Sequence, residues 1–481
     1  MTNPNGIFIH PPYEAWNGLL LDNINSKKRT PRHPLAKSIR AQALASAIDY
    51  HNQLVVLGRK NKLSLSTTNP NINRNLIATG HQPTVYHEGI TAKYDLLKRY
   101  CAQYNASGLN LIIDTDHGDA GEFFFPKLID SKVVIAKTSL VENKGAVFAW
   151  QKLTSANNIT AIHKEVLKEL KLLDIPAYGL NKAFELYTTF AEQEVVSANT
   201  IIRRLSRGDS NYLDLPLSRL IDIPEVKDFL LSYLLDYKSF FVAYNSILDE
   251  YRTLQKIENT ANPFPNLRTA KDLQETPFWL IDRVTGNKFS LFLKEAGARY
   301  LFGDESGHIV GCYTANDIPQ IFNQYYLSPK AFLISLMLRT MLSDLYINGR
   351  GGAKYDKFTD YYLSCISEPA YSFVTVSRDS YLFDSRLEIR DIMYHPEKHL
   401  LDNLLPPASI NRIRILQSIK TTILSHLEKA TTKKLKIGFY TRIKRANRLL
   451  LTIINKTLNR SFTLDKKVQS FRKFPFFFFD L

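Results

Sequence analysis

Two apolar runs separated by a helical repeat stand out between residues 76 and 114. Leu76–Gly80 is a short apolar run that ends in glycine, and Leu109–Asp114 is a second run that ends in aspartate. Between them, Ile90–Tyr104 has apolar residues at helical spacing. A crossover of this length lets both strands lie parallel in one sheet, with their carboxyl ends at the same edge. The chain is therefore predicted to be an α/β protein with a parallel-sheet core.

Other patterns extend along the chain. Residues 1–35 are rich in proline and asparagine, which predicts an extended lead-in, and His33–Gly58 has the apolar spacing of an amphipathic helix. Helical patterns dominate Lys137–Glu258, around a predicted loop at 208–216. Sheet-like character then returns in four short runs, the last of which follows a predicted helix over Pro329–Asp344: Phe278–Ile281, Lys288–Phe292, His308–Tyr313 and Leu345–Ile347.

These patterns divide the 481 residues into four predicted regions. Residues 1–136 would form the lead-in and the first half of a nucleotide-binding-type α/β core, and residues 137–260 a mainly helical insertion. Residues 261–404 would complete the core, and residues 405–481 would form a C-terminal helical arm. Domains usually contain ~100–200 residues, so this length accommodates more than one packed unit.

The predicted arm is strongly basic. The chain carries a net charge of +16, and residues 411–481 alone hold 17 Lys and Arg against three acids, which leaves only +2 for residues 1–410. Two apolar seams predict an antiparallel helix pair that turns near Gly438, and a homodimer formed through this arm. The charge predicts an anionic partner, such as nucleic acid, the phosphates of a nucleotide or an acidic surface. The alternative is a solvated helix face that only keeps the protein soluble.

Composition also bears on the compartment. The three cysteines (Cys101, Cys312, Cys365) form no CxxC pair, which fits a reducing environment and gives no support for a structural zinc site. The N-terminus lacks the pattern of a secretory signal, and no stretch approaches the ~20 apolar residues of a membrane span. We therefore expect a cytoplasmic protein without a membrane partner. The aromatic tail Phe474–Leu481 is expected to dock on the fold.

The first polar cluster follows the first predicted strand. It comprises Thr79, Gly80, His81 and Gln82, with His87 shortly after them. In open parallel sheets ligands bind beyond the carboxyl ends of the strands, and a helix N-terminus there favours an anion. These residues are therefore candidates for binding a substrate or a nucleotide. A strand-ending turn with hydrogen-bonded histidines is the alternative.

The second cluster follows the second strand and contains Asp116 and His117. A carboxylate beside an imidazole suits proton transfer, because each charge can tune the pKa of the other group toward neutral pH. With His81 they are the candidate catalytic residues. The same groups could instead hold a metal together with His81 or His87, although their spacing matches no established metal-ligand pattern. Ordinary turn aspartates and a satisfied loop histidine are the third alternative.

The third cluster follows the predicted strand Leu345–Ile347 and is rich in glycine. Adjacent glycines let the backbone approach a ligand, and their N–H groups can surround an anion. The spacing is neither GxGxxG nor the Walker pattern, so neither a dinucleotide fold nor a P-loop follows from it. The candidate binding residues of this predicted turn are Gly349, Arg350, Gly351, Gly352, Lys354 and Tyr355.

The order TGHQP, DH and GRGGAKYD resembles that of the BshC family, the cysteine-adding enzymes of bacillithiol biosynthesis, and still more its uncharacterised bacterial relatives. Thr79, Gly80 and Gln82 match the family's first motif, Asp116 and His117 its second, and Gly349 and Gly352 its third. The sequence departs from the family at His81, Thr115, Gly118 and Ala353. The match covers 76–125 and 327–375 well, and residues 405–470 correspond to the family's coiled coil.

The resemblance implies a Rossmann-like core of the class I synthetase type, with helical insertions and a coiled-coil arm. It also implies a carbon–nitrogen ligase that joins an amino acid, cysteine in the family, to a small amine such as an amino-sugar conjugate. No motif identifies a cofactor, and ATP or ADP are the candidates. The alternative function is a non-catalytic binding protein of the same fold, whose basic residues 411–481 engage nucleic acid or another polyanion.

Overall fold

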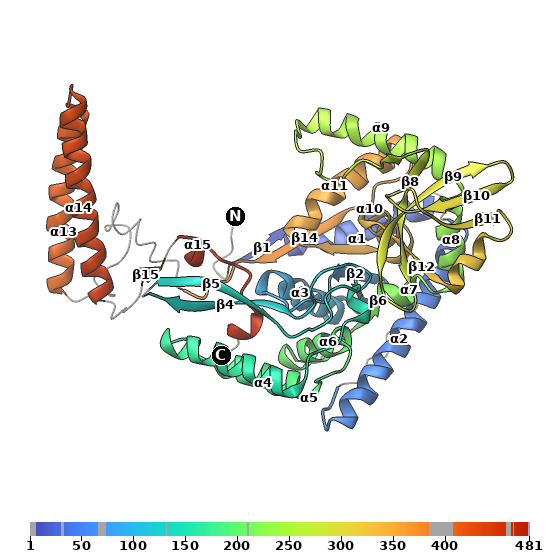
Figure 1. Cartoon of the computed structure of the whole chain (residues 1–481), viewed down its shortest axis with the longest axis horizontal. Helices are drawn as coiled ribbons and strands as arrows, with labels where there is room; N and C mark the ends of the chain where they lie inside the picture. Colours follow the sequence, from blue (N-terminus) through green and yellow to red (C-terminus); the bar gives the residue numbers. More distant parts are fainter. Residues whose placement is uncertain are drawn as a thin grey trace.

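The protein is a mixed α/β structure built around a six-stranded sheet in the order β1-β14-β13-β2-β3-β6 (Figure 1). The computed structural model describes residues 6–29, 33–65, 74–130, 132–208, 211–383, 407–457, 463–464 and 466–479. The strands are β1 (Ile7–His10), β14 (Phe373–Arg378), β13 (Leu345–Asn348), β2 (Leu76–His81), β3 (Ser107–Ile112) and β6 (Tyr212–Pro216).

The predicted strand–helix–strand unit is confirmed. β2 and β3 pair in parallel, with Thr79 opposite Asn110, and α3 (Glu88–Tyr104) connects them. Alternate residues of β2 enter different cores. Leu76 packs with apolar residues of α2 (Ala36–Lys60) on one face of the sheet, and Ile77 packs with apolar residues of α3 on the other. A sheet covered on both faces favours apolar residues at most positions, and this is why the run is nearly continuous.

The strand order reverses between β2 and β13. From β2 the chain adds β3 and β6 in parallel on one side, and later adds β13 and β14 in parallel on the other side. β1 closes the edge beside β14 and is antiparallel to it. In open α/β sheets the crevice at such a reversal is where ligands bind, because the connecting segments diverge there.

Two predictions about the sheet and its lead-in are wrong. The predicted loop at 208–216 contains β6, a fully buried central-sheet strand, so residues 137–260 are more than a helical insertion. The polar Asp214 kept this segment from being predicted as a strand. Its carboxylate is buried against Arg203 and Arg204 at 2.6 and 2.7 Å. The predicted extended lead-in contains α1 (Trp16–Arg29), whose Trp16 side chain is fully buried.

A second sheet has the order β11-β10-β9-β8-β12, with the short β7 (Thr269–Ala270) beside β8. It confirms three predicted strands. Two lie within β8 (Leu273–Asp282) and β9 (Lys288–Ala296), and the third, predicted from His308, is β11 (Ile309–Thr314), shifted by one residue. The sequence did not predict β10 (Arg299–Gly303) or β12 (Tyr325–Pro329). A third sheet joins β4 (Glu122–Ile129), β5 (Lys132–Ser139) and β15 (Thr463–Leu464).

Helices cover these sheets (Figure 1). The predicted helix over Pro329–Asp344 is α10 (Ala331–Met337), which continues as a π-helical turn at Leu338–Leu342. None of the described helices is long and apolar enough to cross a membrane. The remaining covering helices are α4 (Ala156–Leu172), α5 (Tyr178–Thr189), α6 (Val195–Ser206), α7 (Leu217–Leu220), α8 (Pro224–Leu235), α9 (Tyr237–Gln255) and α11 (Arg350–Cys365).

The C-terminal region forms two distinct parts. α13 (Pro407–Glu428) and α14 (Lys433–Thr457) lie side by side, apart from the sheets (Figure 1). The predicted turn near Gly438 is wrong, because the chain turns before Lys433 and Gly438 lies inside α14. After the short α15 (Lys466–Gln469), the aromatic tail docks on the core, as predicted. Phe474 and Phe477 are 0% and 1% exposed, and the N–H of Phe476 donates to the carbonyl of Tyr86 at 2.9 Å.

Candidate functional site

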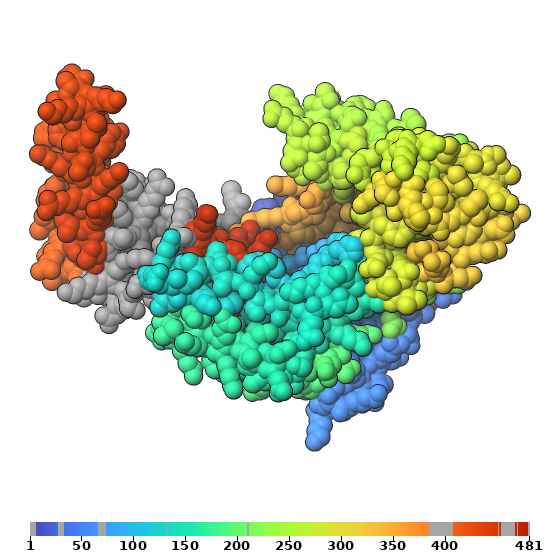
Figure 2. All heavy atoms as spheres, in the orientation of Figure 1, coloured from blue at the N-terminus to red at the C-terminus, as the bar shows by residue number. Residues whose placement is uncertain are grey.

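A cavity of about 1030 Å³ lies beyond the carboxyl ends of β2 and β13, where the strand order reverses. Its walls come from all three predicted clusters, from α3 and α10, and from the C-terminal tail. Figure 2 shows the surface hollowed between the β4–β5 hairpin and α9, with C-terminal residues beside the hollow. The strand ends thus bring together segments that are more than 300 residues apart in the sequence.

The first cluster contributes Gly80, His81, Gln82 and His87 to the cavity wall. Thr79, in contrast, is fully buried inside the sheet and does not line the cavity. Its hydroxyl donates to the carbonyl oxygen of Ile347 at 2.8 Å and so ties β2 to β13. Thr79 pairs with strands on both sides, opposite Ile347 and Asn110, whereas Gly80 and His81 are the last residues of β2, beyond its pairing with β13, where the cavity begins.

Both histidines of this cluster are uncharged at neutral pH. Burial and the charge of Lys93 lower the pKa of His81 to about 3, and its Nδ1 lies 3.0 Å from the carbonyl oxygen of Gln82. Burial and the charges of Arg472 and Lys473 lower the pKa of His87 to about 4. His87 caps α3, because its Nδ1 accepts the N–H of Gly89 at 3.1 Å.

The N-terminus of α3, predicted to receive an anion, is closed by the protein itself. Glu88 is the first residue of α3 and is 3% exposed. Its carboxylate accepts from Arg378 at 2.5 Å and lies 3.2 Å from Arg207. A buried carboxylate satisfies the positive end of the helix dipole, so this end has no need of an external anion.

Lys93 is a site residue that sequence reasoning missed. It lines the cavity, is 3% exposed, and its Nζ donates to the carbonyl oxygen of Gly80 at 2.7 Å. Burial lowers the pKa of this amine to about 7. The available signal was its place on the apolar face of the helix, three residues after Ile90 and four before Leu97. A lysine at such a position is rare unless it has a partner or a function.

Asp116 is the member of the second cluster that faces the cavity. One carboxylate oxygen accepts from Gln82 Nε2 at 2.6 Å and the other lies 2.6 Å from Lys288 Nζ on β9. Burial opposes ionisation of this carboxyl, but Lys288 and the hydrogen bonds outweigh it and lower its pKa. Asp116 therefore joins the first and second clusters and is anionic at neutral pH.

His117 lies differently from its predicted partnership with Asp116. The Asp116 carboxylate accepts the backbone N–H of His117 at 2.9 Å, and the imidazole is exposed. The side chain of His117 does not line the cavity. Partial burial and the nearby charge of Lys288 lower the pKa of His117. The acid–base role of His117 therefore stays a prediction, and its side chain does not face the cavity.

The third cluster is the first part of a helix, where a turn was predicted. Gly349 is the N-cap residue of α11, and the N–H of Ala353 donates to the Gly349 carbonyl at 2.9 Å. A Cβ at Gly351 would meet no atom within 4 Å, whereas a Cβ at Gly352 would lie 2.6 Å from Asn348 Oδ1. A side chain at 352 would therefore have to displace the Asn348 amide, whereas Gly351 leaves the backbone open to the cavity.

Most of this cluster reaches the cavity. The lining residues are Gly349, Arg350, Gly351, Gly352 and Tyr355, whereas Lys354 is exposed and lies outside the lining. The first N–H groups of a helix have no acceptor within it. They therefore add a positive end at the carboxyl edge of β13, where an anionic group can bind.

A second, smaller cavity of about 250 Å³ adjoins the first, with Ile113, Asp116 and Phe264 lining both. Trp279 lines its wall, with the Nζ atoms of Lys288 and Lys330 at 4.5 and 4.9 Å from the ring centroid. Lys330 also pairs with the carboxylate of Glu275 at 2.6 Å. This smaller cavity can hold a ligand whose apolar part lies beside Trp279 and whose polar end lies toward Asp116.

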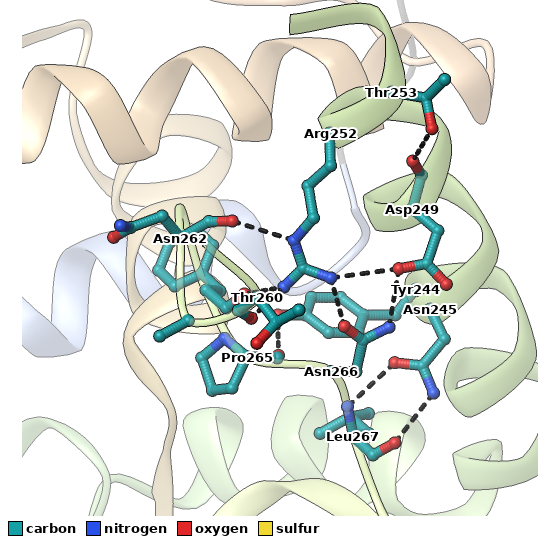
Figure 3. A network of polar contacts seen from close by, with 12 residues as sticks. Tyr244, Asn245, Asp249, Arg252, Thr253, Thr260, Asn262, Pro265, Asn266 and Leu267 are labelled. Carbon is teal, nitrogen blue, oxygen red and sulfur yellow. Dashed lines mark hydrogen bonds and ion pairs between the residues drawn. The ribbon is translucent and has the colours of Figure 1, made fainter. Parts of the chain in front are cut away.

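Phe264, which lines both cavities, lies on a loop fixed by one arginine. Figure 3 shows Arg252 with its contacts to Asn262 and Asp249. The Arg252 guanidinium donates to the carbonyl oxygens of Asn262 at 2.9 Å and of Thr260 and Phe264 at 2.5 Å each. It also pairs with Asp249 at 3.0 Å. A guanidinium has five donors in a fixed plane, so it can hold several carbonyls of one loop.

The described residues contain no group of three or more His, Cys, Asp or Glu side chains that could hold a metal ion. The alternative of a metal site built from the predicted histidines and Asp116 therefore finds no support in the part of the chain that is described. In comparisons with known proteins, no family model matches the chain, and no curated protein matches it.

Proposed function

We propose that the protein is a BshC-like carbon–nitrogen ligase that joins an amino acid to a small amine, in the cytoplasm. The observation that carries this proposal is the meeting of the three polar clusters in one cavity at the reversal of strand order. The order of β6, β3, β2, β13 and β14 supports a Rossmann-like core of the class I synthetase type. The paired helices α13 and α14 support the proposed coiled-coil arm.

The cavity fits a nucleotide, ATP or ADP, through its phosphates. The N-terminus of α11, the Arg350 guanidinium and the buried Lys93 amine face one space and carry positive charge or open N–H groups. Gly351 leaves room for a phosphate to approach the backbone. ATP would activate the carboxyl group of the amino acid by transferring a phosphoryl or an adenylyl group to it, with release of ADP or pyrophosphate, and phosphate or AMP would then leave when the amide forms.

The remaining residues have complementary roles in amide formation. The anionic Asp116, held by Gln82, attracts the amine substrate and orients it. When the amine nitrogen attacks the carboxyl carbon, the new carbon–nitrogen bond forms, the leaving group departs and the amine loses a proton. Lys93, whose pKa is about 7 when no anion lies beside it, can accept this proton as the phosphate or nucleotide group leaves, and we assign it the role first predicted for His117. The compartment beside Trp279 accommodates the amino-acid side chain.

The proposal is tested by calorimetric titration with ATP and ADP, with and without cysteine. We expect binding to the wild-type chain, and at least tenfold weaker binding of nucleotide to Lys93→Met and of the amino-sugar malate conjugate, titrated in the same way, to Asp116→Asn. Lys354→Ala is the matched control, since this lysine is exposed outside the lining, and it should bind like the wild type. Mass spectrometry of mixtures with cysteine and an amino-sugar malate conjugate then tests for the amide. Absence of all binding would contradict the ligase proposal.

A second candidate function is favoured by the surface of the arm. Lys434, Lys436, Arg442 and Lys444 of α14 are exposed and carry no counterpart acids on their own helix. This supports a polyanion, such as nucleic acid, as an alternative partner. Replacing these four residues by glutamine should abolish salt-dependent binding of double-stranded DNA if the arm is responsible. Unchanged binding would contradict this function.

The arm also supports the proposed homodimer. Several large apolar side chains on the helix pair are exposed, among them Ile419 at 47% and Leu435 at 52%. A second copy of the arm could cover them. Sedimentation equilibrium of the wild type and of Ile419→Glu with Leu435→Glu tests this contact. A dimer that persists unchanged in the double variant would contradict it.

A further inference from the structure

The C-terminal tail forms one wall of the larger cavity. Lys467, Ser470, Phe471, Arg472 and Lys473 all line it, together with residues from the strand ends. We propose that this tail carries a second anion subsite, so that the cavity binds a ligand with at least two anionic groups, such as a di- or triphosphate. The inference deepens the proposed function by naming the charge class of the ligand, and it depends on that proposal only for the place of binding.

The tail is held firmly enough to present side chains in fixed positions. Pro475 forms a bridge with His87, and the N–H of Phe476 donates to the Tyr86 carbonyl at 2.9 Å. Phe474 and Phe477 are buried in the core directly after the basic residues. The backbone of 472–473 is therefore anchored beside the first polar cluster.

The tail and the N-terminus of α11 are joined through one carboxylate. Asp379 lies 3.0 Å from the Arg350 guanidinium on one side and pairs with Arg472 on the other. Arg472 also donates to the hydroxyl of Ser377 at 3.1 Å. Asp379 can neutralise only one of the two guanidiniums. A surplus positive charge thus lies between the helix N-terminus and the tail.

The cavity as a whole has an excess of cationic side chains. Among the described residues, five basic side chains line it, one of them Lys93 with its pKa of about 7, against the single carboxylate of Asp116, which is already paired with Lys288. Within the described part of the chain, neither Lys467 nor Lys473 has an ion-pair partner, and both are exposed. The five are Lys93, Arg350, Lys467, Arg472 and Lys473.

The positive charge of the tail also lowers the pKa of His87. After burial, the charges of Arg472 and Lys473 are the main causes of its low pKa. Arg350 and Arg472 share the Asp379 carboxylate, so the positive charges of the α11 N-terminus and of the tail lie close together. A monoanion would offset only part of this charge, whereas a ligand with several linked anionic groups can offset more of it.

The test uses the full-length chain and inorganic tripolyphosphate as the probe, with inorganic phosphate, citrate and ATP as separate arms at fixed ionic strength. Calorimetry compares the wild type with Arg472→Gln plus Lys473→Gln. The matched control is Lys434→Gln plus Lys436→Gln, which removes the same charge from the exposed face of α14. We expect the tail variant to bind tripolyphosphate at least tenfold more weakly and the control to change affinity less than twofold.

Lys473→Gln alone provides a check on folding, because this side chain is exposed and unpaired among the described residues. This variant should keep the wild-type melting temperature and still bind tripolyphosphate several-fold more weakly than the wild type does. Equal affinities of tail variant and wild type, or tripolyphosphate binding no tighter than phosphate, would overturn the inference. Tighter binding of citrate than of tripolyphosphate would assign the subsite to a polycarboxylate.

The outcomes separate this inference from the proposed ligase. Tail-dependent tripolyphosphate binding without any amide product supports the subsite and contradicts the ligase. Amide formation from ATP with an unchanged KM for ATP in the tail variant supports the ligase and overturns the subsite.

Discussion

The amine of Lys93 donates a hydrogen bond to the carbonyl oxygen of Gly80 across 2.7 Å, at the point where β2 ends and the cavity begins. This contact holds a basic group inside the first polar cluster. The amine is 3% exposed, and its burial explains why it can be neutral near physiological pH. Its protonation should therefore respond to whatever binds in the cavity.

Binding of a polyanion should draw a proton onto Lys93. With a pKa of about 7, the amine is mostly neutral at pH 8, and a nearby anion favours the charged form and raises its pKa. Calorimetry of tripolyphosphate at pH 8, in buffers with different ionisation enthalpies, should show uptake of a substantial fraction of one proton. The uptake should shrink at pH 6, where the amine is already charged. Lys93→Met should lack it, and Lys354→Met should retain it.

Acid should destabilise the fold partly through His81. Its pKa is about 3 in the folded protein and about 6.5 in an unfolded chain, so the unfolded state binds more protons between these values. The stability contributed by the neutral imidazole is present above pH 6.5 and declines as pH falls toward 3, by at most about 1.4 kcal/mol per pH unit. Urea unfolding at pH 5 and pH 7 should show a smaller difference in His81→Gln. The exposed His308, replaced by Gln, should leave the difference unchanged.

The buried charge cluster on β6 should be sensitive to loss of its carboxylate. Asp214→Asn leaves the Arg203 and Arg204 guanidiniums buried without their counterion. Breaking such a buried pair costs about 3–5 kcal/mol of unfolding free energy. Urea titration measures this loss. Asp272→Asn, in an exposed ion pair with Lys294, should change the free energy of unfolding by less than about 1 kcal/mol.

The aromatic tail should contribute to the stability of the core. Phe477 is 1% exposed and contacts the rings of Phe123 and Phe184. Phe477→Ala should lower the free energy of unfolding by about 3–5 kcal/mol, through lost burial and the cavity left behind. Tyr440→Ala on the arm, where the side chain is 56% exposed, is the control and should have little effect. A wild-type melting temperature in Phe477→Ala would show that the tail is not part of the folded core.

The α/β class, the parallel pairing of β2 with β3, the strand before Gly349 and the docking of the tail were predictable from the sequence. Each depends on the order of apolar and polar residues within a short segment, which local spacing records. The first two polar clusters were predictable for the same reason, since polar residues directly after an apolar run mark the end of a strand.

Only the tertiary structure decided which of these residues face the cavity. Thr79 is buried in the sheet, where it bonds to Ile347, whereas Gly80 and His81 line the cavity. The Asp116 carboxylate pairs with Lys288, 172 residues later, and not with the neighbouring imidazole. β6 was not predicted because an aspartate is rarely buried, and only the folded structure shows that Asp214 pairs with buried arginines. Arg472 reaches the site because the phenylalanines after it are buried. Such contacts join positions far apart in the chain, and burial free energy rather than local spacing selects them.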